Sequence, residues 1–371
     1  MNRSRWLRSR CGHAFLLLAL MLLGTGCQSV SYYTQAARGQ LEIWRKQQPN
    51  PSLLSNLATP AALKERLALV LELRAFAGTN LHLPARGQYL RYADLGRPFV
   101  VWNVYAAPEL SLDPKAWWYP VVGALDYRGY FSESAARAHA VRLKQQGFDV
   151  HVGGVTAYST LGWFRDPVLN TFIHEPDAEL ADLLFHELAH QRVFIPGDTE
   201  FNEAFATAVG EEGTRRWLES RGDFAALESW RTQLGRSEEF VARLLAARDQ
   251  LSALYTNLPS SPRLTPEQAA AARADKKTIL SHLRDDLERL KVSSPQHAFH
   301  ESWFRENLNN AQLNTVDAYH RLVPAFRRLL RQHDGDLERF YRAVETFRKL
   351  DKPARRVRLM QGSAGWDSVE P

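Results

Sequence analysis

Cysteine is nearly absent from this sequence. Among 371 residues there are two, Cys11 and Cys27, and both belong to the amino-terminal segment discussed next. Because no cysteine follows residue 27, a disulfide framework is excluded as the source of stability, even in an oxidising compartment. Stability must come from packing, and the 345 residues from Cys27 onward can bury a large core in one or two closely packed lobes.

The amino terminus also lacks an apolar run long enough to span a membrane. The run at 14–23 is too short for that. It follows a basic stretch and precedes the small residues 24–26 and Cys27, which is the three-part pattern of a secretory signal. The basic residues are Arg3, Arg5, Arg8 and Arg10.

A cysteine directly after the small residues resembles a bacterial lipoprotein signal. In such a signal, residues 1–26 are removed, and Cys27 is lipidated and becomes the first residue of the mature chain. Gln28, rather than Asp, follows it, as in lipoproteins sent on to the outer membrane. We therefore expect a lipid-anchored protein of the bacterial cell envelope that faces the periplasm. An ordinary secretory signal cut nearby is the alternative.

An excess of one charge is missing as well. The formal net charge of the sequence is +6, and the arginines of the predicted signal account for four of these charges, which leaves +2. So small a charge is unlike the basic surface of nucleic-acid-binding proteins, so we expect no nucleic-acid partner.

What the sequence does contain is the pattern His-Glu-x-x-His, as His186, Glu187 and His190. On a helix, side chains four residues apart lie on one face, so both imidazoles can reach one metal ion. Glu187 lies beside that face and is placed to act as a base toward a metal-activated water. This pattern is typical of zinc peptidases.

The segment 178–194 around the motif is apolar nearly all round, as a buried helix is. Burying two imidazoles and a carboxylate there is costly unless a metal or hydrogen bonds compensate. We therefore predict a zinc-binding helix. Its apolar residues are Leu180, Leu183, Leu184, Phe185, Leu188 and Ala189.

A zinc peptidase site needs a third protein ligand and leaves a fourth position for water. The metzincin pattern places its final His where this chain has Pro196, so that continuation is excluded. A second helix is predicted to start near Asn202, and an antiparallel return can bring Glu203 back toward His190. We predict His186, His190 and Glu203 as ligands. The substitutes for Glu203 are Asp198, Glu200 and Glu211.

Helices and strands alternate before this motif, and helices dominate after it. The expected helices before it are 32–46, 59–78 and 132–146, and the expected strands are 98–107, 119–125, 148–158 and 168–173. The expected helices after it are 203–219, 223–256, 265–292, 311–332 and 336–349.

These elements predict an α+β fold, in which a mostly helical lobe follows a small mixed sheet. By analogy with zinc peptidases of this build, we expect it to be zincin-like, with the sheet packed on the metal-binding helix. We expect a helical and strand region over 27–177, zinc-site helices and helical lobe over 178–361, and a disordered tail over 362–371. By analogy with zinc peptidases whose edge strand lines the cleft, 157–164 is expected at the cleft. A hairpin turn with aromatic packing is the alternative.

Several longer blocks resemble a family of predicted bacterial aminopeptidases that are zinc-dependent lipoproteins. The likeness runs from Cys27 to about residue 350. The blocks are Tyr32-Tyr33-x-Gln35, Ala157-Tyr-Ser-Thr-Leu-Gly-Trp-Phe-x-Asp-Pro167, Phe185-His-Glu-Leu-Ala-His-Gln191, Phe201-Asn-Glu-Ala-Phe-Ala206, Asn309-Asn-Ala311 and Val323-Pro-Ala-Phe326.

The resemblance implies a gluzincin, a zincin whose third ligand is a glutamate on a following helix, here Glu203. This chain departs from the best-known gluzincins in two ways. The gap after His190 is shorter, and Thr207 stands where some of them have an acidic residue one turn beyond the ligand.

The predicted reaction is zinc-dependent hydrolysis of a peptide bond, with Glu187 as general base and a separate donor for the oxyanion. Candidate donors are Tyr158, His174 and Tyr319. An aminopeptidase also needs groups that hold a free amine, for which the candidates are Asp166, Glu175 and Glu211. The alternatives are an envelope endopeptidase with the same site and a non-catalytic zinc-binding envelope lipoprotein.

Overall fold

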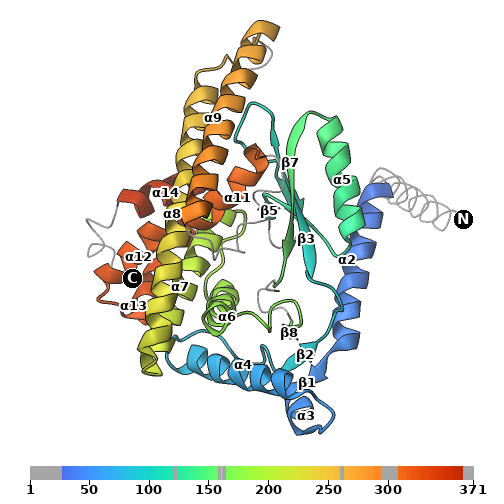
Figure 1. The fold of residues 1–371 in the computed structure, drawn as a ribbon, viewed down its shortest axis with the longest axis vertical. Helices are drawn as coiled ribbons and strands as arrows, with labels where there is room; N and C mark the ends of the chain where they lie inside the picture. The colour runs from blue at the N-terminus through green and yellow to red at the C-terminus, as the bar shows by residue number, and fades with distance from the viewer. Residues whose placement is uncertain are drawn as a thin grey trace, which may run out of the picture.

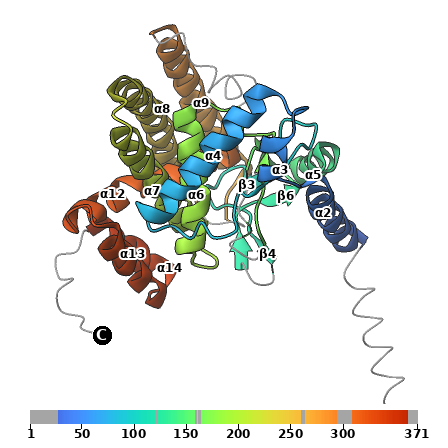
Figure 2. The same ribbon diagram turned by 90° about the horizontal axis from the view of Figure 1, so that it is seen from below.

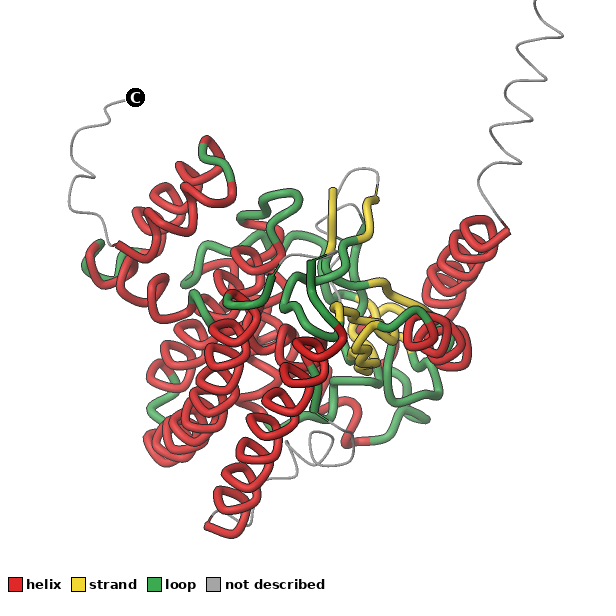
Figure 3. The backbone as a smooth tube through the Cα atoms, turned by 90° about the horizontal axis from the view of Figure 1, so that it is seen from above, coloured by secondary structure: helices red, strands yellow, loops and turns green. Residues whose placement is uncertain are grey.

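The protein is a mixed α+β molecule in which helices dominate. The computed structural model describes residues 27–119, 123–157, 160, 164–259, 263–293 and 308–361. Helices make up most of the molecule, and the strands gather in one region between two groups of helices (Figure 3). The α+β class and the helical carboxy-terminal part agree with the prediction.

The first part of the chain forms three helices and a very small sheet. The helices are α2 (Cys27–Lys46), α3 (Asn50–Ser55) and α4 (Ala61–Thr79). The strands β1 (Gln48–Pro49), β2 (Arg91–Ala93) and β8 (Val168–Leu169) form a mixed sheet, because β2 pairs antiparallel with β1 and parallel with β8. Ala93, Val168 and Leu169 share one apolar core with Leu180 and Leu184 of the metal-motif helix.

A second, larger sheet is antiparallel throughout. Its order is β6-β3-β7, with β3 (Val101–Pro108) between β6 (Arg128–Tyr130) and β7 (Phe148–Val155). The helix α5 (Glu133–Gln145) packs on this sheet, and α2 lies on the same side of the molecule (Figure 1). The expected strand at 119–125 is instead a hairpin of β4 (Trp117–Tyr119) and β5 (Gly123–Leu125).

The metal-motif helix α6 (Asp177–Arg192) packs chiefly against α7 (Thr199–Ser220) and also against α4, which crosses it in the view from below (Figure 2). The prediction that α7 starts near Asn202 was wrong by one turn. The side chain of Asp198 accepts a hydrogen bond from the Phe201 backbone and caps the helix. Asn202 instead forms two 2.8 Å hydrogen bonds with the backbone of Ile195 and so fixes the loop before α7.

The carboxy-terminal part is helical. The long helices α8 (Phe224–Thr256) and α9 (Pro266–Ser293) pair and project from the rest of the molecule (Figure 1). The expected helix 311–332 is two helices, α11 (Asn310–His320) and α12 (Val323–Gln332), because Pro324 stands in the first turn of α12. Then follow α13 (Leu337–Thr346), the 3₁₀ turn η2 (Phe347–Lys349) and α14 (Lys352–Gln361), which was not predicted. The tail 362–371 lies outside the described residues.

The helix α11 connects the two sides of the molecule. It contacts β3 and β7 of the antiparallel sheet, and it also contacts α7 and α8. Residues of the sheet and residues of α7 therefore face a common region next to α11.

A glycine on α7 permits the close approach of α6. A Cβ atom on Gly210 would lie 2.5 Å from Oδ1 and 2.9 Å from the backbone oxygen of Asp182, which real structures do not tolerate. By contrast, a Cβ atom on Gly235, an exposed glycine in α8, would meet nothing within 4 Å.

These two glycines give opposite predictions for Gly→Ala. In a helix, alanine is favoured over glycine by about 1 kcal/mol, so Gly235→Ala should raise the free energy of unfolding by up to that amount. Gly210→Ala should lower it by about 1–2 kcal/mol, because overpacking outweighs the helix propensity. Denaturant unfolding measures both changes. Equal stabilisation of the two variants would contradict the close approach.

Candidate metal centre

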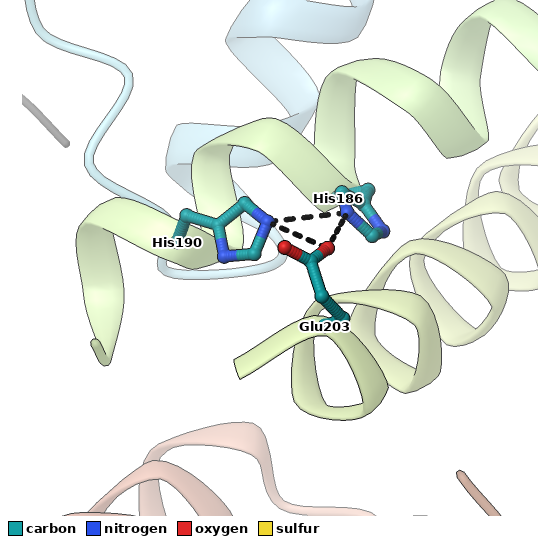
Figure 4. A group of neighbouring side chains, drawn as sticks. All are labelled: His186, His190 and Glu203. Atoms are coloured by element: carbon teal, nitrogen blue, oxygen red, sulfur yellow. Dashed lines mark hydrogen bonds and ion pairs between the residues drawn. The ribbon is translucent and has the colours of Figure 1, made fainter. Parts of the chain in front are cut away.

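Two neighbouring helices bring the predicted ligands together. His186 and His190 are one turn apart on α6, and the loop 193–198 reverses the chain with Gly197 at φ 80°. α7 then returns alongside α6, and Glu203 points between the two imidazole rings (Figure 4). The three side chains form the one described group of His, Cys, Asp and Glu residues that is able to hold a metal ion.

The donor atoms form a compact triangle. The Nε2 atoms of His186 and His190 are 3.2 Å apart, and Oε2 of Glu203 lies 3.3 Å from the first and 3.4 Å from the second. Around a tetrahedral zinc ion with bonds of about 2.0–2.1 Å, neighbouring donor atoms are about 3.3–3.4 Å apart. The triangle therefore fits one such ion, and two imidazoles with one carboxylate are a donor set that zinc accepts.

The triangle is enclosed by protein. The side chains of His186, His190 and Glu203 are 17%, 9% and 12% exposed. Burial by itself would raise the pKa of Glu203, but the charge of His190 and hydrogen bonds from both imidazoles outweigh it and hold that pKa well below its usual range. Glu203 is thus an anion, which is the form that binds a metal.

The adjacent acid, Glu187, is in a different electrostatic situation. Burial raises its pKa to about 7; the charges of Glu203 and Asp166 also raise it, while His190 opposes them. No described residue forms a hydrogen bond or ion pair with its carboxylate. A cation in the triangle would lower this pKa, since an opposite charge favours the carboxylate. Glu187 is therefore a free carboxyl group whose pKa lies near neutrality, beside a charged one.

Three tyrosines stand around the triangle. The ring of Tyr319, on α11, stacks on the ring of His186 with centroids 6.2 Å apart. Tyr105, on β3, and Tyr127, in the turn after β5, lie with their ring centroids 5.7 Å apart. Burial raises the pKa of all three hydroxyls, and the charge of Glu203 raises each further. The hydroxyls therefore stay protonated and are able to donate hydrogen bonds.

The substitutes named for Glu203 are engaged elsewhere. Each pairs with an arginine, at 3.3 Å for Asp198 and 2.7 Å for Glu200 and Glu211. The pairs are Asp198 with Arg355, Glu200 with Arg356 and Glu211 with Arg327. Glu203 is the acid that reaches both imidazoles.

Of the candidates named for the oxyanion and for the free amine, only some lie near the triangle. Tyr319 is there, whereas His174 and Glu175 precede α6 and lie more than two helical turns from His186. Asp166 is buried and accepts hydrogen bonds from the backbone and hydroxyl of Thr160 at 3.0 and 2.7 Å. Tyr158 and most of 157–164 lie outside the described residues, so the cleft assignment of that segment stays a prediction.

Sequence reasoning missed Tyr105 and Tyr127. Tyr105 lies in a predicted strand, where an aromatic residue is usually core packing. Tyr127 is in a short turn between two strands, with no motif around it. Tertiary contacts bring them to the triangle: α11 contacts both β3 and α7, and Gly123 of β5 packs against Gly197 in the loop before α7.

Metal binding should be measurable as thermal stabilisation. Zinc added at 100 times its dissociation constant should stabilise the wild type by about 2.7 kcal/mol, seen as a higher Tm. Glu203→Gln should lose most of this shift, because it removes the anionic donor. Glu219→Gln, an exposed acid on the same helix, should keep the shift. An undiminished shift in Glu203→Gln would rule out Glu203 as a ligand.

Comparisons with known proteins agree with this site at the level of the family. A search of curated proteins and a search of solved structures each found no match. A family model described as "Putative aminopeptidase" matches residues 31–359, which is most of the chain and contains the whole triangle. The chain therefore belongs to this aminopeptidase family.

Proposed function

We propose that this protein is a zinc-dependent aminopeptidase of the gluzincin type, within a zincin-like fold. The observation that carries the proposal is the buried triangle of His186, His190 and Glu203, whose donor atoms are 3.2–3.4 Å apart. Membership of the aminopeptidase family supports peptides as the substrate class. A closed structural zinc site would need a fourth protein ligand, and the described residues supply three.

In this proposal, different residues of the chain have separate roles in the hydrolysis of the peptide bond. Zinc would be held by the two imidazoles and Glu203, and it would supply Lewis acidity toward water and a peptide carbonyl. Glu187 accepts the proton of the attacking water and passes it to the leaving nitrogen. The hydroxyls of Tyr319, Tyr105 and Tyr127 are the candidate donors to the carbonyl oxygen as it becomes negative.

This assignment of roles depends on the difference between the two buried glutamates. Glu203 is held as an anion by the imidazoles, so it serves as a ligand and not as a base. Glu187 has no partner among the described residues, so its carboxylate is free to accept a proton, and its burial favours the protonated form that then releases it. Adjacent carboxylates with such different environments are typical of acid–base sites.

The variant Glu187→Gln tests the role of the base. Peptide hydrolysis should fall by about 10²–10⁴, because the amide cannot accept the proton. Zinc content, measured by atomic emission, should remain that of the wild type.

Glu179→Gln is the matched control on the same helix. Its carboxylate accepts a hydrogen bond from Gln233 and lies about two turns before Glu187, so activity should be unchanged. Full activity in Glu187→Gln would remove Glu187 as the base.

We also propose that the protein is anchored in the envelope membrane by lipid on Cys27. No helix in the described part of the chain is long and apolar enough to cross a membrane. The basic and apolar residues before Cys27, and the small residues next to it, support cleavage and lipidation at that point.

Cysteine replacement separates lipid anchoring from ordinary secretion. Cys27→Ala should abolish incorporation of labelled fatty acid and release the protein from the membrane fraction. Cys11→Ala, the control, should remain labelled and membrane-bound. Labelling of Cys27→Ala at the wild-type level would contradict the anchor.

A further inference from the structure

A cavity of about 290 Å³ is lined by the three tyrosines that lie near the metal triangle, Tyr105, Tyr127 and Tyr319. The rest of its wall comes from the loop 112–114 after β3, the turn after β5, the first turn of α7, and parts of α8, α11 and α14. It is at the small end of ligand pockets, a size suited to the end of a peptide and not to a long segment.

The cavity adjoins the triangle through α7. Glu200 lines the cavity, and Glu203 belongs to the triangle. Residues three apart on a helix are neighbours on one face, with Cβ atoms about 5–6 Å apart. A group bound at Glu200 is therefore about one helical turn from the metal ligands.

The cations that line the cavity are already near carboxylates. Arg248 pairs with Asp317 at 3.1 Å, and Arg356 pairs with Oε2 of Glu200 at 2.7 Å. Nζ of Lys352 lies 4.0 Å from Asp198. The positive side chains of the wall are therefore compensated within the protein.

The acceptors of the wall are not all compensated. Asp126 forms no hydrogen bond and no ion pair within 4.0 Å with any described residue. Thr199 and Glu200 are 6% and 8% exposed, and their Oγ1 and Oε1 atoms are buried without a hydrogen-bond partner in the described structure. Burial raises the pKa of both Asp126 and Glu200, although the charge of Lys352 opposes this shift at Asp126 and the charges of Arg356 and Lys352 oppose it at Glu200. Three acceptor groups of the wall, the Asp126 carboxylate, Oε1 of Glu200 and Oγ1 of Thr199, thus have no hydrogen-bond partner in the described structure.

We propose that this cavity binds the free α-ammonium group of a peptide substrate, held by Asp126, Oε1 of Glu200 and Oγ1 of Thr199. An ammonium group has three N–H donors and a positive charge, which match the unpaired carboxylate of Asp126 and two further acceptor atoms that have no hydrogen-bond partner. The inference rests on the proposed peptidase function and adds the residues that make the site specific for an amino terminus. None of them is among the amine-binding candidates predicted from the sequence.

Peptide binding without turnover tests the cavity directly. The zinc-loaded Glu187→Gln protein is titrated calorimetrically with three tetra-alanine peptides: free amine with amidated carboxyl, acetylated amine with amidated carboxyl, and acetylated amine with free carboxyl. The free-amine peptide should bind about 10- to 100-fold more tightly than the doubly blocked one, as expected for charged hydrogen bonds.

Asp126→Asn in the same background should remove most of this preference, since the substitution keeps the shape and removes the charge. Glu200→Gln is a second variant that should weaken the same peptide. Asp94→Asn, an exposed acid that does not line the cavity, should keep the full preference. The zinc-induced rise in Tm should be the same in all variants, which shows that they are folded.

The outcomes separate the inference from the proposed function. Equal binding of free and acetylated peptides, or a preference for the free carboxyl, would overturn the amine site while leaving a peptidase. If Asp126→Asn kept the full preference for the free-amine peptide, Asp126 would not be a residue that binds the α-ammonium group. If the wild type hydrolysed none of the three peptides and Glu187→Gln bound none, the proposed function and this inference would both fall.

Discussion

The structure depends on the close packing of α6 against α7. Two imidazoles and a glutamate are expensive to bury, and each offsets the cost of the others only when the two helices are near enough for their side chains to meet. Gly210 provides that approach, and Asn202 fixes the loop that sets the register of α7 against α6. The surrounding apolar core, from α4 to α13, holds both helices in place.

This packing places two buried glutamates in different electrostatic environments. Glu203 is surrounded by imidazole nitrogens and stays charged, whereas at Glu187 burial and the charges of Glu203 and Asp166 outweigh the opposing charge of His190. Burial, which raises the pKa of both groups, is opposed much more strongly at Glu203. The same helix pair therefore creates a metal-binding carboxylate and a proton-accepting one.

Local patterns carried much of the sequence prediction. The four-residue spacing of His186 and His190 and the apolar surroundings of α6 are local properties, so the helix and its two imidazoles could be predicted. The prediction of Glu203 as a ligand required only that the next helix run back antiparallel to the metal-motif helix. The start of α7 was misplaced because Asp198, and not Asn202, supplies the cap.

The parts that could not be predicted depend on contacts between distant segments. Tyr105, Tyr127 and Asp126 reach the triangle or the cavity through contacts between distant segments: α11 contacts both β3 and α7, and β5 packs against the loop before α7. The sequence of α14 is too polar to predict a packed helix, yet its Arg355 is buried 3.3 Å from the Asp198 carboxylate. Such tertiary ion pairs leave no periodic signal in the sequence.

The position of α14 has a consequence for biosynthesis. Lys352 and Arg356 form part of the cavity wall, and the buried Arg355 holds the cap of α7, although these residues come more than 130 positions after the last metal ligand. A nascent chain emerging from the ribosome or translocation channel can thus form its histidine pair while one wall of the pocket is still missing. Completion of the pocket therefore waits until residues 352–356 have also been delivered, long after both metal-binding helices.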